Sequence, residues 1–378
     1  MAGREHQIDR FLPAFAIIAL YLGALMAVGV AGGGMDLGVL RSGYLAAIAW
    51  FSLWQALLST VVSVAGGALV ALALNRHRQF WGRRVVVALI GASASLPAIT
   101  VVFGVVALYG KSGVYGTLAT RFGLEPQSWI FGLPGILIAH VTLNLPFAAR
   151  AFLLALESIP AETLKTAAIL DFRSSAYLRH VDGPALRREA PGLALMIALL
   201  CFTSFAVILT LGGGPEHSTL EVAIYTALHI EVDFARALTL ILAQSALCLL
   251  LIVPLLAVSR TNTVTRTQGH LPVRFEASSI LTRCFTCAGV LILCLVLLPP
   301  LGIVLRYVPD MGSLLTLTVA YALITSIAIA LASAALSVGL AVIIGHGISG
   351  AKAFMNMIQL AQIMIEKDVM QKMKEVLS

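Results

Sequence analysis

Long apolar runs, each of about 20 residues or more and separated by short polar and basic segments, restrict this chain more than any other feature. In a lipid bilayer every backbone amide needs a partner within the chain, so spanning segments are helices or closed barrels. The runs do not alternate between apolar and polar residues as barrel strands do. The sequence therefore predicts an all-α, polytopic transmembrane helical bundle.

The composition excludes a soluble domain. Hydrophobic residues make up 59% of the chain and charged residues only 11%, whereas soluble domains carry about 25% charged residues. The formal net charge of +7 comes from residues between apolar runs and not from one basic face, so we expect a lipid bilayer and no nucleic acid as partner.

Eight spans are expected from the apolar runs. The first run is too long for a signal peptide and is interpreted as an uncleaved span. Pro97 is expected to kink the third span. The spans are predicted near residues 12–32, 46–74, 85–109, 133–156, 191–211, 236–258, 284–306 and 315–345.

Positive charge is distributed unequally between the two sides of these spans. If the N-terminus is inside, the outer segments hold only Arg41, Lys111, Arg121, Arg236 and Arg306. Because cytoplasmic segments carry an excess of Lys and Arg, both termini are expected in the cytoplasm. Residues 346–378, which are rich in Lys and Met, are predicted to form an amphipathic cytoplasmic tail.

The inner segment 157–190 is unusually long for a connection between spans. Pro160 and Glu162 suit the first turn of a helix, and Leu164, Ala167 and Ala168 follow at the spacing of one helical face. This pattern predicts a helix with a small apolar face.

A turn at Asp171–Ser174 and a second short helix are expected next. Tyr177, Leu178 and Val181 lie on that helix, and Pro184 is predicted to end it. An apolar face on a folded inner segment has two explanations, which the residues alone leave open. It packs on a protein partner, or it lies on lipid headgroups.

The segment resembles the cytoplasmic coupling loop of the inner-membrane permeases of ATP-binding cassette importers. That pattern has a short Glu-Ala-Ala run, a following glycine and an Ile-x-Leu-Pro ending. Here Lys165 replaces the acidic residue and Asp171 replaces the glycine. The resemblance implies an ATPase-docking loop formed by Glu162, Lys165, Ala167, Ala168, Asp171, Phe172, Val181, Gly183 and Pro184.

Four further segments, at 51–64, 96–110, 135–150 and 201–225, resemble thiamine or thiamine pyrophosphate permeases, with fused iron(III) permeases as the next most similar group. The resemblance implies the fold of a type I importer permease and a three-part organisation. Residues 1–283 are expected to form a first repeat of six transmembrane helices with its coupling loop, residues 284–345 the first two helices of an incomplete second repeat, and residues 346–378 a divergent tail.

The function implied is that of a permease subunit in a bacterial inner membrane, supplied by a periplasmic thiamine-binding protein and driven by a separate ATPase. Gly104–Ser112 does not match a phosphate-binding loop, because five residues and not four separate its glycines. We expect no enzyme, catalytic residue, metal or cofactor. The alternatives are an iron(III) permease, a truncated non-transporting remnant and an ion-coupled secondary transporter.

Polar groups at membrane depth are the candidates for a translocation path. They are Trp54, Gln55, His140, Asn144 and Gln244. The alternative roles are hydrogen bonding between helices and, for Trp54, an interfacial aromatic belt. Gly212, Gly213 and Gly214 form either a gate or a plain turn.

Overall fold

The computed structural model describes residues 18–258, except 79, 94–95, 173 and 215–216, together with residues 280–307 and 316–348. Two compact units divide the chain: Val28–Pro309, and Met1–Ala27 with Asp310–Ser378. In the second unit the described residues include residues 18–27, which are helical, and α16 (Leu317–Ile348). The predicted tail lies outside the described residues, except for 346–348 at the end of α16.

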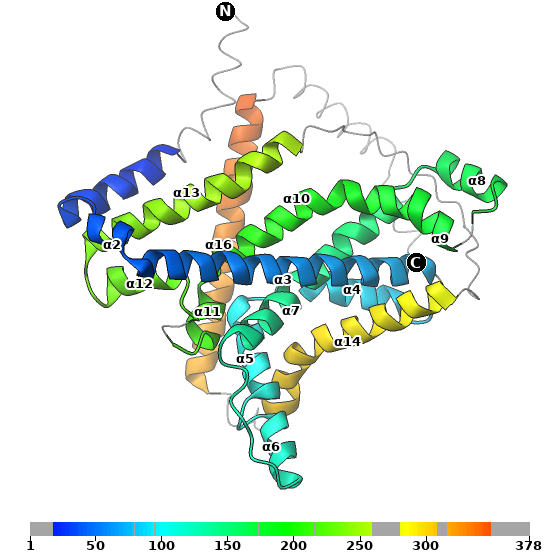
Figure 1. Ribbon diagram of the computed structural model, residues 1–378, viewed down its shortest axis with the longest axis horizontal. Coiled ribbons are helices and arrows are strands. Elements are labelled where there is room, and N and C mark those ends of the chain that lie inside the picture. Colours follow the sequence, from blue (N-terminus) through cyan, green and yellow to red (C-terminus); the bar gives the residue numbers. More distant parts are fainter. Residues whose placement is uncertain are drawn as a thin grey trace, which may run out of the picture. The chain divides into compact units, whose positions relative to one another are not determined.

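The unit Val28–Pro309 is built around the long helix α3 (Gly43–Arg76), which packs against α7 (Leu133–Glu157) and α10 (Gly183–Phe202) (Figure 1). Two glycines let α7 approach closely. A Cβ added to Gly66 would lie 2.5 Å from Cδ1 of Leu145, and one on Gly67 would lie 2.6 Å from Cβ of Ala148. Small residues at such crossings bring backbones together, which is how helices associate without a hydrophobic force between them.

Helix α14 (Ile280–Tyr307) belongs to the same unit and packs against α3 and α5 (Ala98–Tyr109). A Cβ on Gly289 would lie 2.7 Å from Cβ of Ala73, and one on Gly104 would meet the carbonyl of Pro299. Glycines therefore set both of these close helix contacts.

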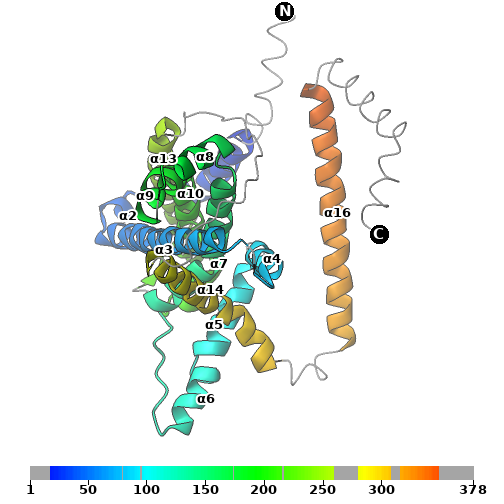
Figure 2. The ribbon, with the colours of Figure 1, turned by 90° about the vertical axis from the view of Figure 1, so that its right-hand side faces the viewer.

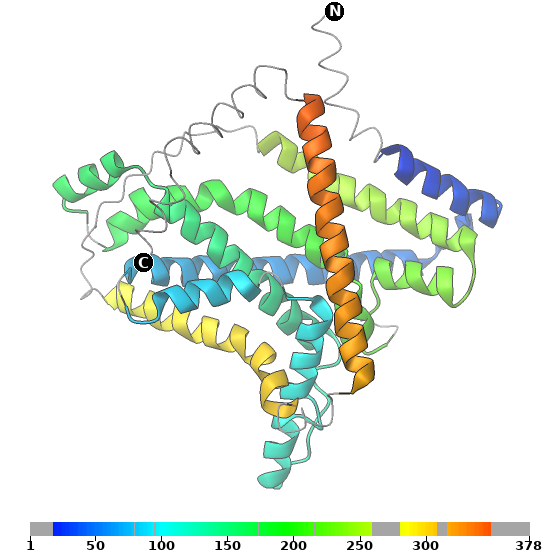
Figure 3. The same ribbon diagram turned by 180° about the vertical axis from the view of Figure 1, so that it is seen from behind.

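Shorter elements complete the unit. Helix α6 (Val114–Arg121) continues beyond α5 (Figure 2), and α12 (Leu220–His229) packs beside α13 (Phe234–Val258) (Figure 3). Helix α2 (Leu37–Arg41) precedes α3, and the unit also holds Val28–Gly32, the last residues of an apolar helix that begins at Ile18. The end of that helix meets α13, since a Cβ on Gly32 would lie 2.6 Å from the amide nitrogen of Ala235.

Two predicted spans are broken in the structure. The run 85–109 is not one kinked helix: α4 (Arg83–Ser93) ends and α5 begins at Ala98, with extended backbone at Pro97 (φ −61°, ψ 137°). Proline lacks an amide donor, so it favours a new helix start over continuation. The run 191–211 divides into α10 and α11 (Ala206–Leu211). The two continuous spans were therefore wrong predictions.

Six helices among the described residues are long and apolar enough to cross a membrane, where eight were predicted. The predicted first span is described only from residue 18. Every regular element in the described parts of the chain is helical, so the all-α transmembrane bundle is confirmed. The six helices are Gly43–Arg76, Ala98–Arg121, Leu133–Glu157, Phe234–Val253, Arg283–Ile303 and Leu317–Ser337.

Candidate coupling segment and buried polar cluster

Residues 158–182, which we call the coupling segment, form a compact helix–turn–helix. Helix α8 (Ala161–Ile169) begins after Pro160 and carries Glu162 in its first turn. It ends in a left-handed turn: Asp171 has φ +48°, its amide donates to the carbonyl of Ala168, and the amide of Phe172 donates to that of Ala167. This hydrogen-bond pair is the Schellman pattern. The turn predicted at Asp171 is confirmed.

The helix after the turn does not end at Pro184. Helix α9 (Ser174–Tyr177), a π-helical segment (Leu178–Asp182) and α10 follow one another without interruption. Pro184 occupies the first turn of α10, where its missing amide hydrogen is least costly, and the wider π turn precedes it. The predicted helix end at Pro184 was therefore wrong.

The apolar face of α8 packs within the segment itself. Leu164 and Ala167 are buried against Tyr177 and Val181, and Phe172 covers the same cluster. The expectation that Leu164 and Ala167 face a partner or lipid was therefore wrong. The helix that follows the turn covers them, and only Ala168 of the predicted face is exposed.

Two exposed apolar residues at the tip of the segment escaped the sequence analysis. Ile169 is 83% exposed and Leu170 is 58% exposed, directly before the turn. Two bulky apolar residues next to the predicted turn could have indicated an exposed apolar tip from the sequence alone. Glu162, Lys165 and Pro184 are also exposed, while Gly183 is half-buried. The docking roles of these residues remain predictions.

A buried ion pair fixes the coupling segment to α3. Nη2 of Arg76, the last residue of α3, donates to Oδ2 of Asp182 at 2.5 Å, with side chains 4% and 0% exposed. The guanidinium carbon also lies 5.1 Å from the ring centroid of Tyr177, within cation–π range. Neither Arg76 nor Asp182 is singled out by a local sequence pattern.

Burial and the neighbouring arginine shift the pKa of Asp182 in opposite directions, whereas burial and the Asp182 charge shift the pKa of Tyr177 in the same direction. Burial raises the pKa of Asp182 to about 6, although neighbouring Arg76 favours the carboxylate. Burial and the charge of Asp182 together raise the pKa of Tyr177 to about 12. The tyrosine therefore stays protonated at neutral pH, and Asp182 is the group that titrates near physiological conditions.

The same end of the bundle carries two further polar links. Arg83 of α4 pairs with Glu157 of α7 at 2.9 Å. Nε2 of His77, just after α3, lies 2.8 Å from Oγ1 of Thr286 in α14. Polar side chains thus join α4 to α7, and join the end of α3 to the π-helical segment and to α14.

Three of the five predicted path residues meet inside the bundle around Cys201 of α10. Nε2 of Gln55 donates to the carbonyl of Cys201 at 2.9 Å, and Nδ2 of Asn144 contacts its Sγ at 3.3 Å. His140 Nδ1 lies 3.2 Å from Oγ of Ser59. These side chains are all buried. We call this group the buried polar cluster, and it links α3, α7 and α10 through hydrogen bonds.

The other two predicted path residues lie elsewhere. Trp54 is 45% exposed and stacks on Trp50, with centroids 6.5 Å apart and planes inclined by 7°. Gln244 of α13 donates to Glu221 of α12. The structure therefore does not bring the five residues into one continuous lining.

The glycine run after α11 packs against the turn before α7. Gly213 and Gly214 have φ of +73° and +133°, values that favour glycine. The amide of Gly132 donates to the carbonyl of Leu211 at 2.6 Å, and a Cβ on Gly213 would lie 3.2 Å from that of Phe131. Gly212 precedes this contact with φ −62°. A gating role for the three glycines remains a prediction.

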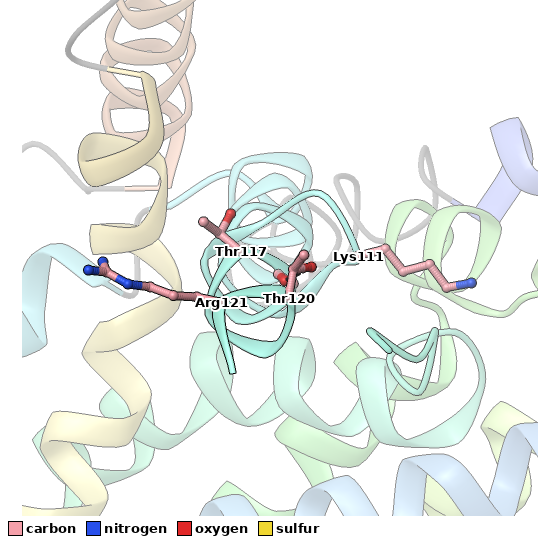
Figure 4. Close-up of a pocket in the computed structure, with 5 residues that line it drawn as sticks. Lys111, Thr117, Thr120 and Arg121 are labelled. Atoms are coloured by element: carbon pink, nitrogen blue, oxygen red, sulfur yellow. Dashed lines mark hydrogen bonds between the residues drawn. The ribbon is translucent and has the colours of Figure 1, made fainter. Parts of the chain in front are cut away.

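A surface hollow of about 430 Å³ lies beside α6 (Figure 4). Lys111 and Arg121 extend to opposite sides of it in the figure. The hydroxyls of Thr117 and Thr120 donate to the carbonyls of Gly113 and Gly116 in their own helix. Because its polar groups do not converge, the hollow carries no site assignment.

Comparison with known proteins identifies thiamine permeases as relatives. The thiamine transport system permease protein ThiP of Brucella melitensis is 38% identical over 324 residues, which are 84% of this chain and 59% of that protein. ThiP of Escherichia coli (strain K12) is 46% identical over 211 residues, 56% of this chain and 39% of that protein. The predicted resemblance to thiamine permeases is confirmed. The chain spans less than two thirds of the length of these relatives.

A solved structure shares the fold. One chain of a bacterial alginate ABC transporter, in complex with an alginate pentasaccharide-bound periplasmic protein, matches with a TM-score of 0.56 and 16% identity, covering 70% of this chain and 99% of that one. No family model matches the sequence. The fold class of an ABC importer permease is therefore confirmed.

Proposed function

We propose that this chain, a relative of the thiamine permeases, is the membrane-spanning permease subunit of an ATP-binding cassette importer that moves thiamine or thiamine pyrophosphate into the cytoplasm. The observation that carries the proposal is the folded coupling segment, whose own core is filled and whose tip exposes Ile169 and Leu170. An exposed apolar tip on a rigid base suits a protein partner.

A separate ATPase subunit would dock on the coupling segment at the cytoplasmic side. Ile169 and Leu170 would insert into its surface, with the charged side chains of Glu162 and Lys165 at the rim. Asp171 and Phe172 would shape the turn, Ala167 and Val181 would support it from inside, and Ala168 would extend the contact. Gly183 and Pro184 would join the segment to the bundle. A periplasmic thiamine-binding protein would deliver the substrate.

The sidedness follows from the charge distribution. Arg76, Arg83 and the coupling segment lie on the side rich in Lys and Arg, which is cytoplasmic in bacterial inner-membrane proteins. Both termini are then cytoplasmic. We retain the three-part organisation as part of the proposal: residues 1–283 as a first repeat, 284–345 as two helices of a second repeat and 346–378 as a tail.

The substrate would pass close to the buried polar cluster when the helices rearrange. Gln55, His140 and Asn144 offer buried hydrogen-bonding groups at membrane depth. Trp54 on α3 and Gln244 on α13 lie outside this cluster and would contact the substrate at other points of its path. The backbone freedom of Gly212–Gly214 would let the bundle open where the segment after α11 meets the turn before α7. We assign no catalytic reaction, metal or cofactor to the chain.

Co-purification with the cognate ATPase tests the docking role. The double variant Ile169→Asp/Leu170→Asp should lose the ATPase, because two charges replace the apolar tip. A matched control is Phe122→Asp/Leu124→Asp, which changes two exposed apolar residues after α6, 77% and 65% exposed. Equal recovery of the ATPase with both double variants would refute docking at the segment.

Uptake of radiolabelled thiamine tests the transport role. A permease-deficient cell that retains its ATPase and binding protein should accumulate thiamine when this chain is supplied. Accumulation of iron(III) in place of thiamine would overturn the substrate assignment, and no accumulation of either would overturn the transport role.

A further inference from the structure

Several contacts join the coupling segment to the bundle: Ile159 and Leu178 pack against the main core, α9 contacts α14, and Asp182 pairs with Arg76. Helix α8 packs on the π-helical segment, and the cluster of Leu164, Ala167, Tyr177 and Val181 closes within the segment. Asp182 is the last residue of the π-helical segment and pairs with Arg76. The ion pair therefore lies where the segment joins α10 and where α3 ends.

Helix α3 is suited to carry a displacement into the bundle. It runs parallel to α7, since Ser59 lies beside His140 and Gly67 lies against Ala148. It runs antiparallel to α10, since Arg76 meets Asp182 at one end and Gln55 meets Cys201 further along. A shift at Arg76 would therefore act on the helices that hold the buried polar cluster.

Stability alone is a weak explanation for this contact. A buried ion pair often gains little, because removing both charges from water costs about as much as their attraction returns. The raised pKa of Asp182 indicates that Arg76 does not fully offset the cost of burial. In some proteins such a pair is retained because it fixes one geometry. The Tyr177 ring, packed on the same guanidinium, restricts Arg76 further.

We infer that Arg76 and Asp182 are positioning residues that hold the coupling segment and α3 as one rigid body, so that a displacement of the segment moves α3. The inference rests on the proposed function, in which an ATPase displaces the segment. Arg76 acts here through Asp182 and touches no substrate.

Spin labels on the segment and on α3 test the rigid body in the chain alone. Cysteines replace Ile169 and Val61, which are 83% and 55% exposed, and every native cysteine other than buried Cys201 is changed to serine. The distribution of distances between the two spin labels should be narrow when the Arg76–Asp182 ion pair is intact. It should broaden in Asp182→Asn and stay narrow in the control Arg84→Gln, which removes an exposed arginine near the same end.

Two further variants separate positioning from folding. Arg76→Gln/Asp182→Asn leaves neither charge buried alone, so it should fold and still broaden the distribution. The swap Arg76→Asp/Asp182→Arg restores a pair and should narrow it again. A distribution that stays narrow in folded Arg76→Gln/Asp182→Asn would overturn the inference.

The assembled importer gives the second readout. With the ATPase and binding protein present, loss of the pair should raise the ATP hydrolysed per thiamine imported by roughly 2- to 30-fold, the range for one coupling contact. ATPase recovery should stay unchanged. If the ATPase fails to bind even the unaltered chain, the proposed function fails, and the spin-label distances still decide whether the rigid body exists. An unchanged ATP-to-thiamine ratio with bound ATPase would overturn the coupling role.

Discussion

Gly67 of α3 lies so close to Ala148 of α7 that a side chain at residue 67 would place its Cβ 2.6 Å from that of the alanine. The same Cβ would lie 2.9 Å from the amide nitrogen of Ala149, so backbone as well as side chain stands in the way. The two helices can meet in this manner only because residue 67 has no side chain.

Gly67→Val should therefore force α3 and α7 apart. We expect a loss of about 1–3 kcal/mol or more, the cost of overpacking a close contact, measured as a lower thermal unfolding midpoint in detergent. The control is Gly91→Ala in α4, where an added Cβ meets no atom within 4 Å. That variant should keep or raise the midpoint, because alanine favours helix over glycine by about 1 kcal/mol. Equal midpoints for the two variants would contradict the close contact.

Asp182 should make stability fall as pH rises. Its pKa in the folded chain is about 6 and its ordinary value is 3.8, so between these values the folded state holds more protons than the unfolded state. By linkage the free energy of unfolding decreases with rising pH across that window. Its contribution is most favourable below about pH 4 and is lost by about pH 6.

Unfolding midpoints measured between pH 4 and pH 7 would test this. The unaltered chain should show a steeper decline than Asp182→Asn, since the amide does not titrate. The difference corresponds to about 3 kcal/mol at most, for a shift of roughly two pH units. Parallel profiles for the two proteins would mean that Asp182 has an ordinary pKa.

Ser59→Ala should destabilise the bundle by about 1–2 kcal/mol, because Nδ1 of buried His140 would lose its partner. Denaturant unfolding in micelles would measure the loss. Ser112→Ala, at an exposed turn, should change stability by less than about 0.5 kcal/mol. If His140→Ala removed the effect of Ser59→Ala, the two residues would be energetically coupled, as the 3.2 Å contact predicts.

Asp171→Val should loosen the end of α8. The residue has φ +48°, a conformation that costs β-branched residues more than aspartate or asparagine. Hydrogen exchange at the amides of residues 161–172 should accelerate roughly tenfold, for a cost of about 1.4 kcal/mol. Asp171→Asn should leave exchange nearly unchanged. Similar exchange in both variants would show that the turn does not depend on its left-handed residue.

Sequence reasoning succeeded where the determinants are local. The helix after Pro160 and the turn at Asp171 follow from residues a few positions apart, and the helical class follows from the apolar runs. It failed at Pro97, because sequence did not distinguish a kink from a complete break. It also failed for Leu164 and Ala167, since a helical face does not disclose what covers it.

Long-range pairing lay beyond the sequence. Arg76 and Asp182 are 106 positions apart, and each resembles an ordinary loop charge when taken alone. Gln55, His140 and Asn144 were predicted individually as polar residues at membrane depth. Their meeting around Cys201 depends on how α3, α7 and α10 are oriented, which no local pattern specifies.

The π-helical segment at Leu178–Asp182 fixes the number of residues between Tyr177 and the buried part of α10. A π turn inserts an additional residue into a helix, and each residue turns an α-helix by about 100°. The insertion lets Tyr177 face Arg76 while Ile197 and Cys201, further along, remain buried. Deleting a single residue there would rotate one half of this helix against the other, and the two surfaces could no longer be buried together.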